Sequence, residues 1–145
     1  MDDVPAGPAS TGPRRPSLSV VVPVRNGGVD FERCLRRLRN SHWTDYELVV
    51  VDDGSTDSSA GLAESNGAIV ARHDRPLGPA AARNLGARLA SAPLIFFIDA
   101  DVAVYPETIG RGVQRFLDDP GLTALFGSYD DEPSARGLVS QFRNL

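Results

Sequence analysis

The segment YELVVVDDGS at residues 46–55 decides the fold class. Its apolar run is continuous and does not alternate with polar residues, so it predicts a strand that is buried on both faces. The run ends at two adjacent carboxylates, Asp52 and Asp53, and then enters a turn. Strands of this kind are typical of parallel sheets covered by helices on both sides. The segment therefore predicts an α/β domain with polar groups directly after a buried strand.

Similar apolar runs alternate with amphipathic segments along the rest of the chain. Phe31, Leu35 and Leu38 recur at helical spacing, and Ala at most positions of 78–92 would let that helix lie close against a sheet. The expected strands are 18–24, 46–55 with its turn, 68–73, 93–101 and 122–129, and the expected helices are 29–40, 55–67, 78–92 and 106–119. The alternation predicts βαβ units and a mostly parallel, Rossmann-like sheet with helices on both faces.

The length of 145 residues suits one domain with one core. Residues 1–16 are rich in Pro, Gly, Ser and Ala and contain no apolar stretch, so we expect a disordered tail and no secretory signal. The domain is expected to occupy 17–145. No run approaches the roughly 18 apolar residues of a membrane span.

The charge pattern and the rare residues exclude several classes of function. The net charge is −4, and the 15 basic residues, all Arg, are scattered and form no stripe that would favour nucleic acid. The absence of Lys excludes a Walker-type phosphate loop and Schiff-base chemistry. Cys34 is the single cysteine, which excludes an intrachain disulfide and argues against a cysteine zinc site. We expect it to be a core residue on a helix.

Polar residues follow three of the expected strands. Ligands of open parallel sheets bind beyond the carboxyl ends of the strands, so these residues should share one rim. Asp99 and Asp101 flank one alanine, and in an extended chain residues i and i+2 point to the same side. Two carboxylates suit Mg²⁺ or Mn²⁺ when substrate phosphates supply other ligands. Alone the tripeptide is more typical of a solvated loop, but its place after a buried strand favours a site.

Two other segments offer groups to the same rim. Adjacent strand residues point to opposite faces, so only one of Asp52 and Asp53 can face a ligand. A carboxylate there would accept a ring N–H and select uracil or guanine over adenine. Arg83 falls in the first turns of the helix 78–92, where it could meet a phosphate or a base carbonyl, although a solvent-facing role is the alternative.

The remaining polar and aromatic residues near these segments have structural interpretations. One of Ser55, Thr56 and Asp57 is expected to cap the helix that follows. His42, His73 and Trp43 have no partner at a recognisable spacing, so surface or packing roles are expected for them.

Four segments, in order, resemble the sugar-donor half of a family 2 glycosyltransferase: LSVVVPVRNGG, ELVVVDDGSTDSS, GPAAARNLGARLA and IFFIDADV. The resemblance covers residues 17–129 and implies the GT-A fold. It implies that Asp53 contacts the base, that Arg83 lies in the sugar-donor pocket, and that Asp101 holds Mg²⁺ or Mn²⁺, with Asp99 as a second candidate ligand toward the ribose. The residues expected to line the nucleoside pocket are Pro23, Val24 and Asn26.

The same resemblance implies a reaction. A sugar would pass, with inversion, from a UDP- or GDP-linked donor to a saccharide or lipid-phosphate acceptor, while the cation neutralises charge on the leaving diphosphate. The general base of this family comes well after the Asp-x-Asp motif and is expected beyond residue 145. We therefore expect the chain to be the truncated N-terminal portion of such an enzyme, binding the sugar donor without efficient turnover. A cytoplasmic location is expected, with the inner face of the membrane as an alternative.

Two other hypotheses about the function remain open at this point. One is a sugar-nucleotide-binding but catalytically inactive module. Another is a nucleotidyltransferase-like enzyme, although PVRNGG at 23–28 is a poor match to the Gly-rich basic loop that such enzymes carry after the first strand.

Overall fold

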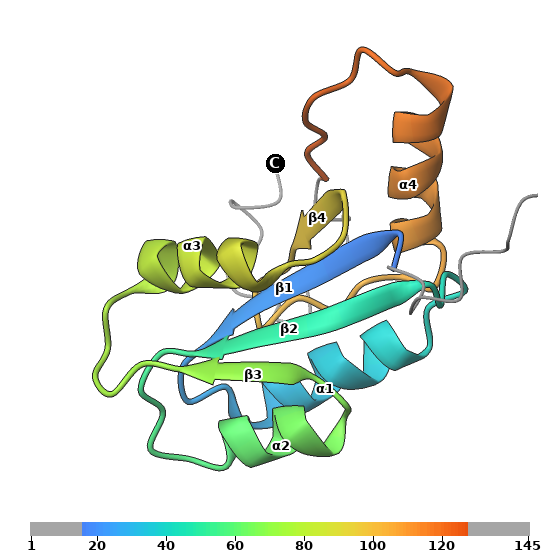
Figure 1. Cartoon of the computed structure of the whole chain (residues 1–145). Helices are drawn as coiled ribbons and strands as arrows, with labels where there is room; N and C mark the ends of the chain where they lie inside the picture. Colours follow the sequence, from blue (N-terminus) through green and yellow to red (C-terminus); the bar gives the residue numbers. More distant parts are fainter. Residues whose placement is uncertain (1–15, 128–145) are drawn as a thin grey trace, which may run out of the picture. The chain divides into compact units, whose positions relative to one another are not determined.

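The computed structural model of the chain describes residues 16–127. Strands and helices alternate in it as predicted (Figure 1). Their order is β1 Leu18–Val24, α1 Gly28–Arg39, β2 Tyr46–Asp52, α2 Ser59–Ser65, β3 Ile69–Arg72, α3 Pro79–Leu89, β4 Leu94–Phe97 and α4 Thr108–Asp118. The predicted tail at 1–16 lies outside the described residues except for Pro16. None of the helices within 16–127 has the length and apolar character that a membrane span requires.

The four strands form one parallel sheet in the order β3-β2-β1-β4. β1 is central, and all seven of its residues are buried, as its continuous apolar run predicts. Along it, Val24 pairs with Asp52 of β2, and Val21 pairs with Phe97 of β4. The predicted parallel α/β sheet is therefore confirmed.

Helices cover both faces of this sheet (Figure 1). On one face, Val20 and Val22 of β1 share a buried core with Phe31 of α1 and Ala63 of α2. On the other face α3 packs against β1 and β2. A Cβ atom at Gly86 of α3 would collide with Cγ1 of Val21, so the helix lies this close to the sheet only because residue 86 has no side chain.

The chain divides into two compact units, one up to Val113 and one from Gln114. The first contains the whole sheet. In the second, the expected strand at 122–129 does not form over its described part, 122–127, and Phe126 there is 92% exposed. A strand needs a neighbour that completes its hydrogen-bond ladder, and the described residues of this unit supply none. Residues 128–129 of this expected strand lie outside the described part.

Candidate functional site

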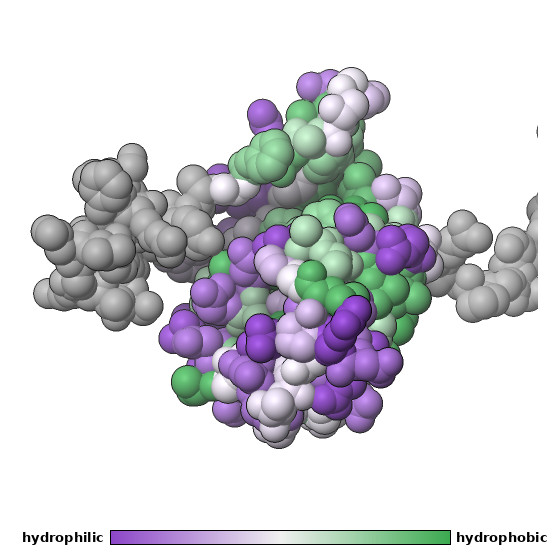
Figure 2. Space-filling model, turned by 90° about the vertical axis from the view of Figure 1, so that its left-hand side faces the viewer, coloured by the Kyte–Doolittle hydropathy of each residue, from purple (hydrophilic) through white to green (hydrophobic). Residues whose placement is uncertain are grey.

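The carboxyl ends of β1, β2 and β4 meet at one edge of the sheet. The N–H of Asp53 donates to the Val24 carbonyl at 2.8 Å, and the N–H of Ile98 donates to the Val21 carbonyl at 3.0 Å. Asp53 and Asp99 therefore leave the sheet on the two sides of β1. Figure 2 looks onto this end of the molecule, where hydrophilic residues cover much of the surface beside a smaller apolar area. The structure thus brings the acidic segments to a common edge.

Asp52 is completely buried and serves the turn that follows β2. Its Oδ1 accepts the N–H of Ser55 at 2.9 Å. Its Oδ2 lies 3.3 Å from Nε of Arg72, which is an ion pair without hydrogen-bond alignment. Nη2 of Arg72 also donates to the Ser55 carbonyl at 2.6 Å. One carboxylate of the pair is thus committed to holding the β2–α2 loop against β3.

Asp53 is 5% exposed and holds the loop that precedes α3. Its Oδ1 accepts the N–H of Leu77 at 2.8 Å and contacts Nδ1 of His73 at 2.7 Å, while its Oδ2 accepts the N–H of Gly78 at 2.8 Å. Burial alone would raise the pKa of Asp53, but these hydrogen bonds hold it below its ordinary value. Asp53 is therefore an ionised carboxylate at neutral pH.

His73 is a contact that the sequence did not reveal. Because β2 and β3 pair with Asp52 opposite Arg72, the next residues, Asp53 and His73, stand level with each other. The carboxylate can only accept, so Nδ1 of His73 carries the proton between them. The strand register was the missing information, since nothing in the sequence fixes it. His42 is exposed, and Trp43 donates from Nε1 to Ser17 Oγ at 3.2 Å, in keeping with the expected surface and packing roles.

Asn26 connects the loop after β1 to the loop after β2 by hydrogen bonds. Its φ of 50° lies in the left-handed region, which Asn tolerates better than most residues. Its Oδ1 accepts the N–H of Thr56 at 2.8 Å, and its own N–H donates to Oγ of Ser55 at 2.9 Å. The N–H of Gly27 donates to Ser59 Oγ at 3.1 Å. Asn26 therefore lies exposed at the edge of the sheet in a fixed conformation.

The helix cap differs from the prediction. Ser58 occupies the N-cap position of α2, without a side-chain hydrogen bond to the helix. Ser55 and Thr56 bind the β1–α1 loop instead, so neither caps the helix. Asp57 accepts the N–H of Ser59 at 3.0 Å, which satisfies the first helical donor from one residue before the cap.

Pro23 and Val24 do not present side chains to the edge. Both are buried, and Val24 belongs to the core cluster that contains Phe31. The Val24 carbonyl is used by the N–H of Asp53. These two residues therefore support the edge from the buried side of the sheet.

Asp99 and Asp101 lie in a turn after β4. The strand ends at Phe97, and the N–H of Val102 donates to the Asp99 carbonyl at 3.0 Å. The extended-chain argument for their orientation is therefore wrong, because the chain has already turned. Both residues are exposed, and Asp99 forms an ion pair with Nη2 of Arg83. Within residues 16–127 no side chain pairs with the carboxylate of Asp101.

Cys34 lies beneath this turn on α1. It is 1% exposed, and its Sγ is 3.9 Å from the Asp99 carbonyl. Burial, and then the negative charge of Asp101, raise the pKa of Cys34 to about 12, with Arg33 acting in the opposite direction. Cys34 therefore remains a neutral thiol in the core, as the sequence predicts, and offers no thiolate to a metal or a substrate.

The start of α3 connects the two acidic segments. Gly78, the residue at its N-cap, donates to Asp53, and Arg83 pairs with Asp99. At a rise of about 1.5 Å per residue, these two positions are about 7.5 Å apart along the helix axis. Asp53 and Asp99 are therefore close enough for one nucleotide-sized ligand to reach both.

The exposed turn also meets the chemical requirements of a divalent cation. Among the described residues no cluster of three or more His, Cys, Asp or Glu side chains could enclose a metal. Mg²⁺ and Mn²⁺ accept one or two protein carboxylates when phosphates and waters complete the shell. The carboxylate of Asp101, which has no side-chain partner among the described residues, fits that role, whereas Asp99 would have to exchange Arg83 for a ligand.

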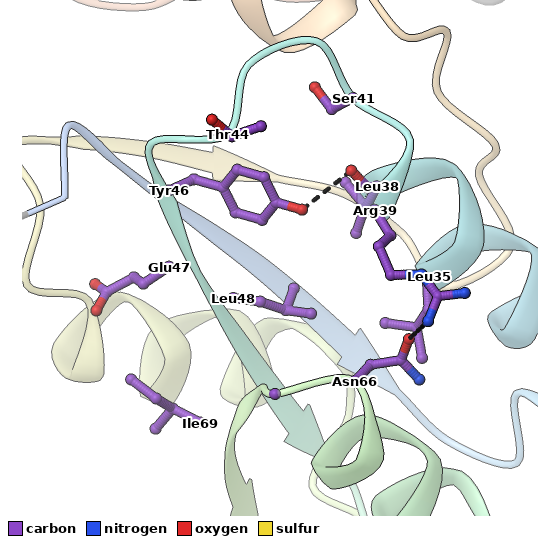
Figure 3. Close-up of a pocket in the computed structure, with 11 residues that line it drawn as sticks. Leu35, Leu38, Arg39, Ser41, Thr44, Tyr46, Glu47, Leu48, Asn66 and Ile69 are labelled. Atoms are coloured by element: carbon purple, nitrogen blue, oxygen red, sulfur yellow. Dashed lines mark hydrogen bonds between the residues drawn. The ribbon is translucent and has the colours of Figure 1, made fainter.

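A cavity of about 470 Å³ lies at the other end of the strands. The beginnings of β2 and β3 and the ends of α1 and α2 line it (Figure 3). Within it the Tyr46 hydroxyl donates to the Leu38 carbonyl at 3.0 Å, and Arg39 donates to Asn66 at 3.5 Å. None of the sugar-donor residues predicted from the sequence lines this cavity.

Comparison with known proteins identifies the family. The profile described as Glycosyl transferase family 2 matches residues 19–144. The chain is 40% identical over 140 residues to validoxylamine A glucosyltransferase of Streptomyces hygroscopicus subsp. jinggangensis, covering 88% of this chain and 33% of that protein. It is 38% identical over 106 residues to an uncharacterized glycosyltransferase of Escherichia coli (strain K12), YibD, covering 70% of this chain and 31% of that protein.

Two solved structures share the fold. The 1–349 fragment of S. aureus TarS, in complex with UDP-GlcNAc, matches with a TM-score of 0.67 and 26% identity, over 70% of this chain and 31% of that chain. The mannosyltransferase PcManGT of Pyrobaculum calidifontis, in complex with GDP-Man and Mn²⁺, matches with a TM-score of 0.66 and 25% identity, over 79% of this chain and 36% of that chain. The chain thus spans about a third of the length of these relatives. With most of its residues matched by the family profile, the chain belongs to glycosyltransferase family 2.

Proposed function

We propose that the carboxyl edge of the sheet binds a nucleoside diphosphate sugar together with a divalent cation, for transfer of the sugar to an acceptor. The observation that carries this proposal is the position of α3, whose first turns contact Asp53 at one end and Asp99 at the other. A nucleotide lying along this helix would meet a buried carboxylate at its base and an exposed acidic turn at its diphosphate. The complexes of TarS with UDP-GlcNAc and of PcManGT with GDP-Man and Mn²⁺ support the assignment.

Each residue has a role in this proposal. Asp53, ionised and buried, accepts a ring N–H of the base with its remaining acceptor position. Arg83 exchanges part of its pairing with Asp99 for a phosphate oxygen, which a guanidinium binds well. Asp101 holds Mg²⁺ or Mn²⁺, Asp99 lies toward the ribose, and Asn26 borders the nucleoside with Pro23 and Val24 beneath it.

The proposed reaction is an inverting displacement at the anomeric carbon. When bound, the cation would stabilise the negative charge that develops on the leaving diphosphate. The chain's own residues hold the nucleotide and orient its diphosphate toward the turn at 99–102. No described residue is assigned as the general base, so the acceptor, a saccharide or a lipid phosphate, and the complete activity are proposals for the whole protein.

Isothermal titration calorimetry with UDP and GDP, each with Mn²⁺ or with EDTA, tests the site. We expect binding that Mn²⁺ strengthens about tenfold or more, and an Asp101→Asn variant that loses this gain, because one ionic ligand is removed. Glu64→Gln is the matched control, since Glu64 is exposed on α2 away from the edge.

Two outcomes would contradict the proposal. Binding that Asp101→Asn leaves unchanged would place the nucleotide elsewhere. The same titrations with UTP and with UDP-GlcNAc would extend the test. Tighter binding of UTP than of UDP-GlcNAc would favour the nucleotidyltransferase alternative.

A further inference from the structure

We infer from the hydrogen bonds of Asp53 that the sugar donor carries a base with a single imide N–H, which is uracil or thymine, and not guanine. This inference rests on the proposed function, because it assumes that Asp53 faces the base. The fold does not decide the question, since one structural neighbour is in complex with UDP-GlcNAc and the other with GDP-Man.

The argument begins with the acceptor positions of the carboxylate. A carboxylate offers about four lone-pair positions, two on each oxygen. On Asp53, His73 and the N–H of Leu77 fill both positions of Oδ1, and the N–H of Gly78 fills one position of Oδ2. Among the donors in residues 16–127 these are the three that reach it, so one acceptor position remains, on Oδ2.

The three existing donors are held in place and cannot easily yield. Two of them are main-chain groups at the start of α3, and Gly78 reaches its position with a φ of 92°, which is natural only for glycine. The third, the side chain of His73, is 12% exposed. A ligand must therefore use the remaining position of Oδ2 and cannot open Oδ1.

The bases differ in what they present to such a carboxylate. Guanine presents two N–H groups side by side, from N1 and from the amino group, and pairs fully only with two free oxygens. Uracil and thymine present a single N–H between two carbonyls, which one free position satisfies. Cytosine and adenine present an amino N–H, but the ring nitrogen beside it is unprotonated, so its lone pair would face the carboxylate. The imide bases alone offer one N–H without a second unpaired donor and without a ring lone pair against the carboxylate.

A ligand series on the wild-type chain tests the inference without mutation. Titrations in Mn²⁺ would compare UDP, 5-methyluridine diphosphate, GDP, CDP and 3-methyluridine diphosphate. UDP and 5-methyluridine diphosphate should bind alike, since their imide groups are the same. GDP should bind about tenfold more weakly because one N–H stays unpaired, and the 3-methyl compound should be at least as weak because it lacks the imide N–H.

Variants of His73 test the mechanism of selection. His73→Ala frees a position on Oδ1, so the preference for UDP over GDP should narrow by about threefold or more. His73→Asn can return an amide N–H to the position of Nδ1 and should keep the wild-type preference. A thermal unfolding curve for each variant shows that the preference is measured on folded protein.

The results separate this inference from the proposed function. Binding of GDP as tight as that of UDP, with the Mn²⁺ effect still lost in Asp101→Asn, would overturn the inference and leave the sugar-donor site standing. An unchanged preference in folded His73→Ala would overturn the role of the filled Oδ1. Failure of every nucleotide to bind would remove the proposed function and this inference with it.

Discussion

Two acidic pairs follow two strands of the same sheet, and they differ in almost every physical respect. Asp52 and Asp53 are buried and accept hydrogen bonds from the two loops that follow β2 and β3. Asp99 and Asp101 are exposed, and the ion pair between Asp99 and Arg83 lies at the surface. The buried pair holds the loops at the carboxyl ends of the strands in place. The exposed pair keeps carboxylate oxygens available for a ligand that binds and dissociates.

Removing one buried and one exposed carboxylate should change the stability of the fold to very different extents. Asp52→Ala should lower the free energy of unfolding by about 2–3 kcal/mol, because the N–H of Ser55 loses its buried acceptor and a small cavity forms. Asp101→Asn should change it by less than about 0.5 kcal/mol, since its side chain is exposed. Urea unfolding of both variants measures the difference. Equal losses of unfolding free energy in the two variants would show that the exposed turn stabilises the fold as much as the buried pair does.

Within the buried pair, the carboxylate of Asp53 should make the stability depend on pH. Hydrogen bonds lower the pKa of Asp53 in the folded state, so its contribution to stability is complete above the ordinary pKa of an Asp and is lost as the pH falls through the folded pKa. Asp53→Asn removes that titration, so the variant should be less stable at neutral pH and should lose less of its stability between about pH 5 and pH 3. Urea midpoints at each pH measure this. Parallel curves for wild type and variant would contradict it.

The exposed ion pair between Arg83 and Asp99 should contribute little to stability. Arg83→Gln should lower the free energy of unfolding by no more than about 1 kcal/mol, because both partners are more than a third exposed and water screens the pair. Arg88→Gln, an exposed position on the same helix, is the control. Chemical unfolding in low and high salt compares the two. A loss well above about 1 kcal/mol at high salt would mean that the ion pair stabilises the fold as a buried contact would.

The sequence predicts the sheet well, because its signals are local and strong. β1 is predicted residue for residue, since its apolar run of seven residues is rich in β-branched Val and too short for a typical helix. The edge at which the acidic segments meet also follows from the sequence, because parallel strands share their carboxyl ends.

What the sequence did not predict depends on the positions of distant segments. The contact between His73 and Asp53 requires the register of β2 and β3, which no local pattern contains. The sequence predicts a strand up to Asp101 because the apolar run continues to Ile98, whereas β4 ends at Phe97 and the Asp99 carbonyl closes a turn with Val102. The expected strand at 122–129 has β-forming residues, but over 122–127 it has no neighbouring strand.

The missing side chain at Gly86 has a consequence for how variants of this protein would be interpreted. Gly86 lies against Val21 in the middle of α3, and through α3 it determines where both Gly78 and Arg83 stand. A larger residue there would push the helix outward. The contact of Gly78 with Asp53 and that of Arg83 with Asp99 would then be disturbed at the same time. Weak nucleotide binding in such a variant would report a displaced support and should not be mistaken for a lost contact to the ligand.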